Sequence, residues 1–221
     1  MDDISVYLGG FEFWSHLSDE EKTDIRKNAI GRIYPAGSVI FHSASECLGF
    51  VYVIEGSLRT YMMSDEGKEV TLFRLNAGEC CVLSASCVIK EISFDSYMAA
   101  DENTKLMIIN ASTVSRLSKQ NIYFRCFTYE LATRRFSAAM KTMDNLLFLK
   151  LEGRLASFLL SEYERTGETE IRMTHEQVAQ YINSAREVVA RTLKRFVQDG
   201  LAEVKRGVII LKDLDGLKAL I

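Results

Sequence analysis

Three ionic side chains stand close together near the start of a stretch that is otherwise apolar at helical spacing, NSAREVVARTLKRF (183–196). They are Arg186, Glu187 and Arg191. A helix that only packs would keep its charges on one solvated face, whereas these cluster in the first two turns, directly after a turn residue. Arginine can donate two hydrogen bonds to guanine, and glutamate can accept one from the amino group of cytosine. The three residues therefore predict contacts with base edges of DNA.

A helix-turn-helix with a wing is predicted to hold these residues. Thr174-His175-Glu176-Gln177 is a capping box that begins one helix, and Asn183 tolerates the left-handed conformation of a tight turn. Ser184 and Glu187 have the spacing of a second capping box, so we expect Ser184 to cap the second helix. LAEVKRGVIIL then predicts a hairpin around residues 205–207, which is a wing. In this arrangement the front of the second helix enters the major groove.

Basic and hydroxyl side chains around this helix are expected to bind phosphates, which supply salt-sensitive affinity without sequence information. The predicted phosphate contacts are Thr174, His175, Ser184, Lys194, Arg195, Lys205 and Arg206. The alternative is a solvated helix face on which Glu187 serves only to cap Ser184. Because Glu187 cannot fully satisfy both its own helix start and a base, we expect some competition between these roles.

Composition places the chain among ordinary globular proteins. Its 221 residues are 48% hydrophobic and 26% charged, with a formal net charge of −3, which excludes a uniformly basic surface but not a local basic patch. No apolar run is long enough to span a membrane, and the acidic N-terminus does not resemble a secretory signal, so we expect a cytoplasmic location and no membrane partner. Five cysteines, an odd number, argue against a disulfide framework.

The predicted fold class is α+β. Short apolar stretches alternate with turn signals from Tyr34 to Asn110, which predicts an antiparallel β-roll, jelly-roll or cupin-like, of about eight strands. Helical periodicity follows from about Ser112, and residues 122–149 contain no proline or glycine. Such a long helix needs an apolar partner, either a symmetric copy of itself or its own β domain. We predict a β-roll effector or sensor domain with an N-terminal helix over residues 1–111, a long dimerisation helix and hinge over 112–149, and a winged helix-turn-helix over 150–221.

The sequence resembles the Crp/Fnr family of bacterial transcription regulators. The resemblance is strongest over MTHEQVAQYINSAREVVARTLKRFVQDGL and DNLLFLKLEGRLASFLL. The resemblance implies a homodimer that binds a palindromic site on double-stranded DNA, an effector in the β-roll that shifts the DNA-binding heads, and RNA polymerase as a candidate partner. Arg186, Glu187 and Arg191 match the three base-reading positions of the cyclic-AMP-responsive branch. They imply a half-site similar to TGTGA.

The predicted effector site departs from that branch, whose members hold the phosphate with Gly-Glu followed by Arg-Ser. Val82-Leu83 stands where Gly-Glu would fall, and residues 76–97 contain no arginine, so a buried phosphate would lack a cationic partner. The positions that match the family's adenine contacts are the apolar Ala139 and Met140. We therefore predict no cyclic AMP binding and leave open an unidentified small apolar or aromatic effector. Its expected surroundings are Leu83, Phe94, Tyr97, Ala139 and Met140.

Three cysteines, Cys80, Cys81 and Cys87, crowd the same region. They can pack the roll as small apolar side chains, or they can form a thiol redox or metal sensor, for which Lys90 is the one nearby cation. The oxygen-responsive branch of the family holds an iron–sulfur cluster on N-terminal cysteines, but no cysteine precedes Cys47 here, so we expect no such cluster.

The histidines and the basic residues of the chain argue against functions other than DNA binding. The three histidines, His16, His42 and His175, are scattered, so neither haem nor a metal site is predicted. A cupin-type enzyme needs several histidines converging in the barrel, and the roll contains only His42, so we predict no enzyme. The remaining alternative is a ligand- or redox-sensing interaction module whose winged helix binds protein. Such a module would have a neutral recognition surface, against which the basic residues of 186–195 argue.

Overall fold

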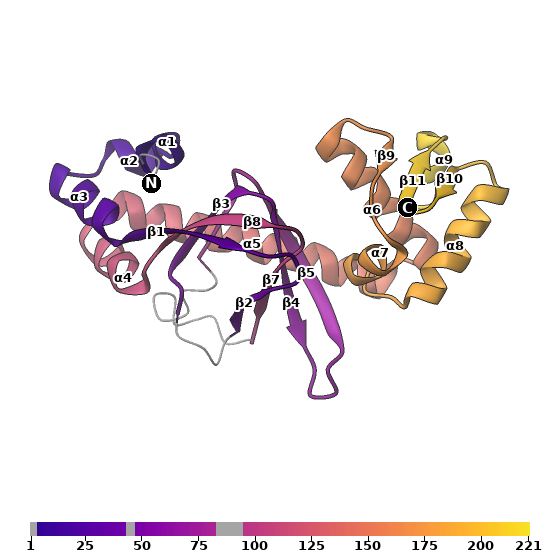
Figure 1. Ribbon diagram of the computed structural model, residues 1–221, viewed down its shortest axis with the longest axis horizontal. Coiled ribbons are helices and arrows are strands. Elements are labelled where there is room, and N and C mark those ends of the chain that lie inside the picture. The colour runs from indigo at the N-terminus through magenta and orange to yellow at the C-terminus, as the bar shows by residue number, and fades with distance from the viewer. Residues whose placement is uncertain (1–3, 43–46, 83–94) are drawn as a thin grey trace. The chain divides into compact units, whose positions relative to one another are not determined.

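The computed structural model describes residues 4–42, 47–82 and 95–221. The chain forms two compact units (Figure 1). The first unit comprises Met1–Lys68 and Leu72–Ala139, and the second comprises Glu69–Thr71 and Met140–Ile221. No helix in the described ranges is long and apolar enough to cross a membrane.

Two antiparallel four-stranded sheets form the β-roll of the first unit, with strand orders β1-β8-β3-β6 and β2-β7-β4-β5. Their strands are β1 (Ala29–Tyr34), β2 (Val39–His42), β3 (Phe50–Glu55), β4 (Ser57–Met63), β5 (Glu69–Asn76), β6 (Cys80–Cys81), β7 (Tyr97–Ala100) and β8 (Thr104–Ile109). The hairpin of β4 and β5 projects from the sheets (Figure 1). The antiparallel roll predicted from the sequence is confirmed.

Strand alternation separates two buried clusters in this unit. Between the sheets, Val53 and Leu106 of one sheet pack with Leu58 and Met98 of the other. On the opposite face of the first sheet, neighbouring residues such as Met107 pack against helices. Those helices are α1 (Ile4–Leu8), α2 (Glu12–Ser15), α3 (Asp19–Asn28), α4 (Ala111–Gln120) and α5 (Ile122–Phe148).

The helical segment after the roll is divided at Asn121, whereas the periodicity from Ser112 predicted one long helix. Asn121 has φ −117° and ψ 116°, an extended conformation that ends α4. Its side-chain oxygen accepts a hydrogen bond from the Phe124 N–H at 3.1 Å, and its amide donates to the His16 carbonyl at 3.0 Å. The asparagine therefore caps the start of α5 and explains the break.

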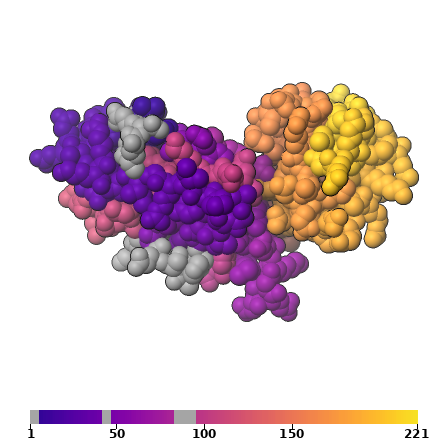
Figure 2. Space-filling model, in the orientation of Figure 1, coloured from indigo at the N-terminus to yellow at the C-terminus, as the bar shows by residue number. Residues whose placement is uncertain are grey.

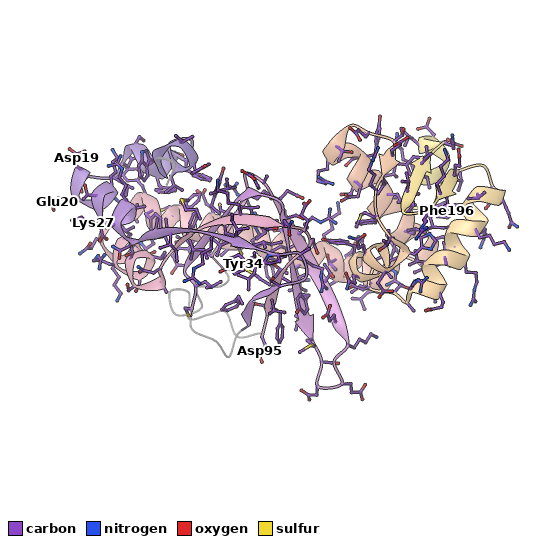
Figure 3. All side chains as sticks on the ribbon, viewed as in Figure 1. Asp19, Glu20, Lys27, Tyr34, Asp95 and Phe196 are labelled. Atoms are coloured by element: carbon purple, nitrogen blue, oxygen red, sulfur yellow. The ribbon has the colours of Figure 1, made fainter. Side chains whose placement is uncertain are left out.

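The second unit packs helices against a three-stranded antiparallel sheet of order β10-β11-β9. Its elements are α6 (Leu151–Thr166), β9 (Glu170–Ile171), α7 (His175–Tyr181), α8 (Arg186–Gln198), β10 (Ala202–Lys205), β11 (Val208–Leu211) and α9 (Leu214–Lys218). Gly167 ends α6 in the left-handed conformation, φ 73°, which glycine adopts at little cost. Phe196 points from α8 into the core of this unit, where it is 1% exposed (Figure 3).

Candidate nucleic-acid interface

Helices α7 and α8 are joined by the short turn that the sequence predicted. Thr174 caps α7: its hydroxyl accepts from the Gln177 N–H at 3.2 Å, and the Gln177 side chain accepts from the Thr174 N–H at 2.8 Å. Asn183 has φ 54° and is the one non-glycine residue of the described ranges with positive φ. Left-handed backbone at this point reverses the chain between the helices.

The start of α8 differs from the second capping box expected from the sequence. Ala185, not Ser184, is the N-cap, and no side chain caps the helix. The Ser184 N–H instead donates to the Ala179 carbonyl at 2.9 Å, which closes the end of α7. Glu187 therefore does not cap Ser184, and the expected competition between capping and base contact does not arise.

One face of α8 is buried and the opposite face is exposed. Val189, Leu193 and Phe196 lie in the core of the second unit. Arg186, Glu187, Arg191 and Lys194 are all exposed, and α8 lies at the surface of its unit (Figure 2). No side-chain hydrogen bond or ion pair joins any of these four to another residue that the structure describes. Their charges are therefore available to a ligand.

A surface hollow lies beside the start of α8. Three elements line it: the N-terminal end of α7, the first residue of α8 and the wing formed by β10 and β11. Its lining residues are Thr174, His175, Glu176, Arg186, Val204, Lys205, Arg206 and Gly207. The structure thus brings four of the residues predicted to bind phosphate, Thr174, His175, Lys205 and Arg206, together with Arg186.

Two of the predicted phosphate contacts already have carboxylate partners. Arg195 donates to Glu152 of α6 at 2.9 Å and lies 3.8 Å from Asp199. Lys205 lies 3.2 Å from Glu203, whose pKa is lowered by hydrogen bonds from Lys212 and Lys205. The contact with Glu152 joins α8 to the first turn of α6. This contact could not be predicted from the sequence, because its partners lie 43 positions apart.

Helix α5 has two apolar faces, and one of them is uncovered. Phe124 and Leu131 are buried on the roll side, and Arg135 donates to the Cys80 carbonyl at 2.8 Å. On another face of α5, four exposed residues recur every seven positions, beginning at Ile122. Each of them is followed four positions later by a second exposed residue. We call this set the α5 stripe: Ile122, Cys126, Tyr129, Thr133, Phe136, Met140, Met143 and Leu147. The two partners weighed for this helix, its own roll and a symmetric copy, are therefore compatible.

The three predicted effector residues that the structure describes, Tyr97, Ala139 and Met140, do not line one site. Leu83 and Phe94 lie outside the described residues. Tyr97 adjoins the core residue Met98 on β7, so it points to the other face of its sheet, where it stacks on Tyr61 at 5.3 Å. Ala139 packs against the core between the sheets, whereas Met140 is 49% exposed on the α5 stripe.

The cysteines of this region also point apart. Cys80 and Cys81 are both buried, but Cys80 packs with the helices and Cys81 packs between the sheets. Burial raises the pKa of the Cys80 thiol to about 12, although nearby Arg135 opposes the shift. A thiol with so high a pKa is a poor redox sensor. Cys87 lies outside the described residues.

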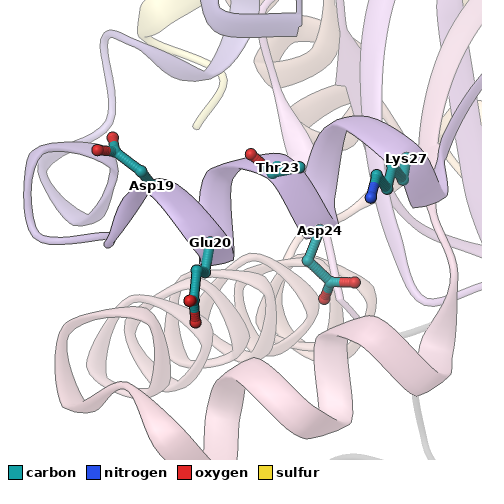
Figure 4. Close-up of a pocket in the computed structure, with 5 residues that line it drawn as sticks. All are labelled: Asp19, Glu20, Thr23, Asp24 and Lys27. Atoms are coloured by element: carbon teal, nitrogen blue, oxygen red, sulfur yellow. The ribbon is translucent and has the colours of Figure 1, made fainter.

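A second hollow, on the exposed side of α3, is lined by acidic side chains (Figure 4). The residues around it are Asp19, Glu20, Thr23, Asp24 and Lys27. Asp24 forms an ion pair with Arg116 of α4. Within the described ranges, no group of three or more histidine, cysteine, aspartate or glutamate side chains is arranged to hold a metal ion. The ion pair joins α3 to α4.

A β-roll followed by a long helix and a winged helix-turn-helix with an exposed, ionic recognition face defines a DNA-binding transcription regulator. Two family models match the chain: the cyclic nucleotide-binding domain over residues 31–121 and the Crp-like helix-turn-helix domain over residues 153–220. A solved Crp/Fnr-family transcriptional regulator from Eubacterium rectale is 37% identical, covering 95% of this chain and 97% of that one, with a TM-score of 0.86. This chain belongs to the Crp/Fnr family of transcription regulators, as the sequence predicted.

Two regulators of named function are more distant relatives. The cAMP-activated global transcriptional regulator CRP of Salmonella typhimurium is 24% identical over 200 residues, which cover 80% of this chain and 87% of that protein. The transcriptional regulatory protein btr of Bordetella pertussis is 28% identical over 174 residues, covering 75% of this chain and 70% of that protein.

Proposed function

We propose that this regulator acts as a homodimer that binds a two-fold symmetric DNA site through Arg186, Glu187 and Arg191. The proposed half-site is similar to TGTGA, and an effector other than cyclic AMP controls binding from the roll unit. The observation that supports the DNA contacts is that all three side chains are exposed and have no partner among the described residues, beside a hollow lined by basic groups.

Base recognition follows from the chemistry of these side chains. The two arginines can each donate two bonds to guanine, and Glu187 can accept from cytosine. In this proposal Thr174, His175 and Arg206, which line the hollow, bind the sugar-phosphate backbone. A protein-binding winged helix would gain little from unpaired charges of this density, because desolvating them at an interface is costly.

Dimerisation is supported by the α5 stripe. A seven-residue repeat of apolar positions with companions four residues later is the pattern of a coiled coil. The opposite face of α5 is occupied by the roll, so the stripe needs a second helix, and a copy of α5 supplies an identical surface. A parallel pair about a two-fold axis would also present two recognition helices to successive major grooves, roughly 34 Å apart.

The DNA contacts can be tested by selecting bound sequences from random duplexes and comparing Arg186→Ala with wild type. We expect Arg186→Ala to lose discrimination at one base pair in each half-site, by about 1–3 kcal/mol, without unfolding. Arg165→Ala is the matched control, because Arg165 is an exposed arginine of α6 outside the hollow and pairs with Glu162. Equal losses of Arg186→Ala on every sequence would contradict base reading.

The dimer geometry can be tested with a short bifunctional maleimide. In a parallel pair about a two-fold axis, Cys126 of the α5 stripe faces its own copy, so we expect a covalent dimer joined through that residue. Peptide mapping identifies the joined cysteines, and Cys126→Ser removes the product. An antiparallel pair would place the two cysteines far apart and leave the chains unjoined.

The exclusion of cyclic AMP is supported by the residues that replace the family's phosphate site. Residues 76–97 contain no arginine, and Ala139 is packed against the core between the sheets. Calorimetric titration with cyclic AMP should therefore give no heat of binding at micromolar concentrations. A micromolar dissociation constant would overturn this part of the proposal.

A further inference from the structure

We propose that Glu176 weakens the binding of DNA by placing a carboxylate against its phosphate backbone. This inference rests on the proposed function, because it needs a duplex in the hollow beside α8. Glu176 lines that hollow together with Thr174, His175, Arg186 and the wing turn. The hollow that is otherwise suited to an anion therefore contains one acidic side chain.

The charge of Glu176 is not neutralised within the second unit. Its side chain is exposed and forms no hydrogen bond or ion pair with another residue of the described chain. Two other carboxylates of the second unit have basic partners. Glu203 of the wing is bonded to Lys205 and Lys212, and Asp199 lies beside Arg195. Glu187 shares the lack of a partner but lies on α8, where the proposed function gives it a base to accept from.

The position of Glu176 in α7 accounts for its presence. It is the second residue of the helix, in the turn where backbone N–H groups point outward, and a negative charge there stabilises the helix. The same N-terminal end faces the hollow. Glu176 should therefore have opposite effects on two properties: it stabilises α7 and it repels a bound phosphate backbone.

The size of the repulsion follows from Coulomb's law. Two unit charges about 4–8 Å apart in water interact strongly enough to change an affinity by about two- to sixfold. Salt screens the interaction, so the effect is largest below about 0.1 M ionic strength. Since phosphates repeat along every duplex, the repulsion should act equally on all sequences.

The test compares Glu176→Gln with wild type in gel-shift titrations on the selected site and on an unrelated duplex, across a salt series. We expect affinity to rise about two- to sixfold on both duplexes at low salt, with a smaller gain at high salt. The melting temperature of the variant should not exceed that of wild type. Glu176→Asp, which keeps the charge, should bind much as wild type does.

Glu168→Gln is the matched control, because Glu168 is an exposed glutamate of the same unit outside the hollow. Its affinity should not change. An unchanged or weaker affinity of Glu176→Gln would overturn the inference, as would a gain confined to one sequence or matched by a rise in melting temperature. A wild-type protein with no site preference would instead overturn the proposed function, so the two failures are distinguishable.

Discussion

Phe136 is the residue at which the proposed dimer can be tested most directly. It lies in the middle of the α5 stripe and is 62% exposed in the single chain. Its neighbour Arg135 is held by Glu79 and the Cys80 carbonyl on the roll side. Phe136→Ala therefore removes apolar surface from the face proposed to bind a second copy, while the contacts of α5 with its own roll remain.

The expected loss follows from the exposed area. A phenylalanine presents about 200 Å², so about 120 Å² of Phe136 remains to be covered in each copy. Truncation to alanine removes about two thirds of this area, and at about 25 cal/mol per Å² full burial gives ~2 kcal/mol per copy and ~4 kcal/mol per dimer. If only half of the area is covered, the loss is ~2 kcal/mol per dimer. The dimer dissociation constant should therefore rise about 30- to 1,000-fold.

Sedimentation equilibrium over a concentration series measures this constant. Lys141→Ala is the control, because Lys141 is exposed on α5 but lies off the stripe, and it should leave the constant unchanged. The melting temperature of Phe136→Ala, measured where both proteins are monomers, should match that of wild type. A dissociation constant within threefold of wild type would refute the assignment of the stripe as the dimer contact.

Other expectations follow from local contacts. In folded protein diluted until it is monomeric, at pH 8, Cys80 should resist iodoacetamide while the exposed Cys126 reacts, because Cys80 keeps its proton below a pKa of about 12; peptide mass mapping distinguishes them. Gly153→Ala should destabilise the second unit by about 1–3 kcal/mol, because its new Cβ would lie 2.8 Å from the Leu220 carbonyl oxygen. Removing residues 220–221 from this variant should restore its melting temperature to that of the truncated wild type. Thr174→Ala should cost about 1 kcal/mol in thermal unfolding through the lost cap of α7, and Thr174→Ser should recover most of it.

The helix-turn-helix could be predicted from the sequence because its capping and turn signals are local. The capping box of Thr174 and Gln177 and the asparagine at the turn each specify backbone conformation within a few residues. The helical periodicity from about Ser112 is equally local. The alternation of short apolar stretches with turn signals over residues 34–110 predicted the β-roll in the same way. The signals of the second unit predicted the winged domain and the face of α8 that carries Arg186, Glu187 and Arg191.

Contacts between distant segments were decided by the tertiary structure. Ala185 rather than Ser184 is the N-cap of α8, and the Ser184 N–H donates to a carbonyl of α7. Arg195 donates to a glutamate of α6. Cys80 and Cys81 lie in separate cores because helices cover one face of their sheet and the second sheet covers the other. Hydrogen-bonding partners and burial depend on which elements meet in space, and sequence spacing fixes only which residues share a face of one element.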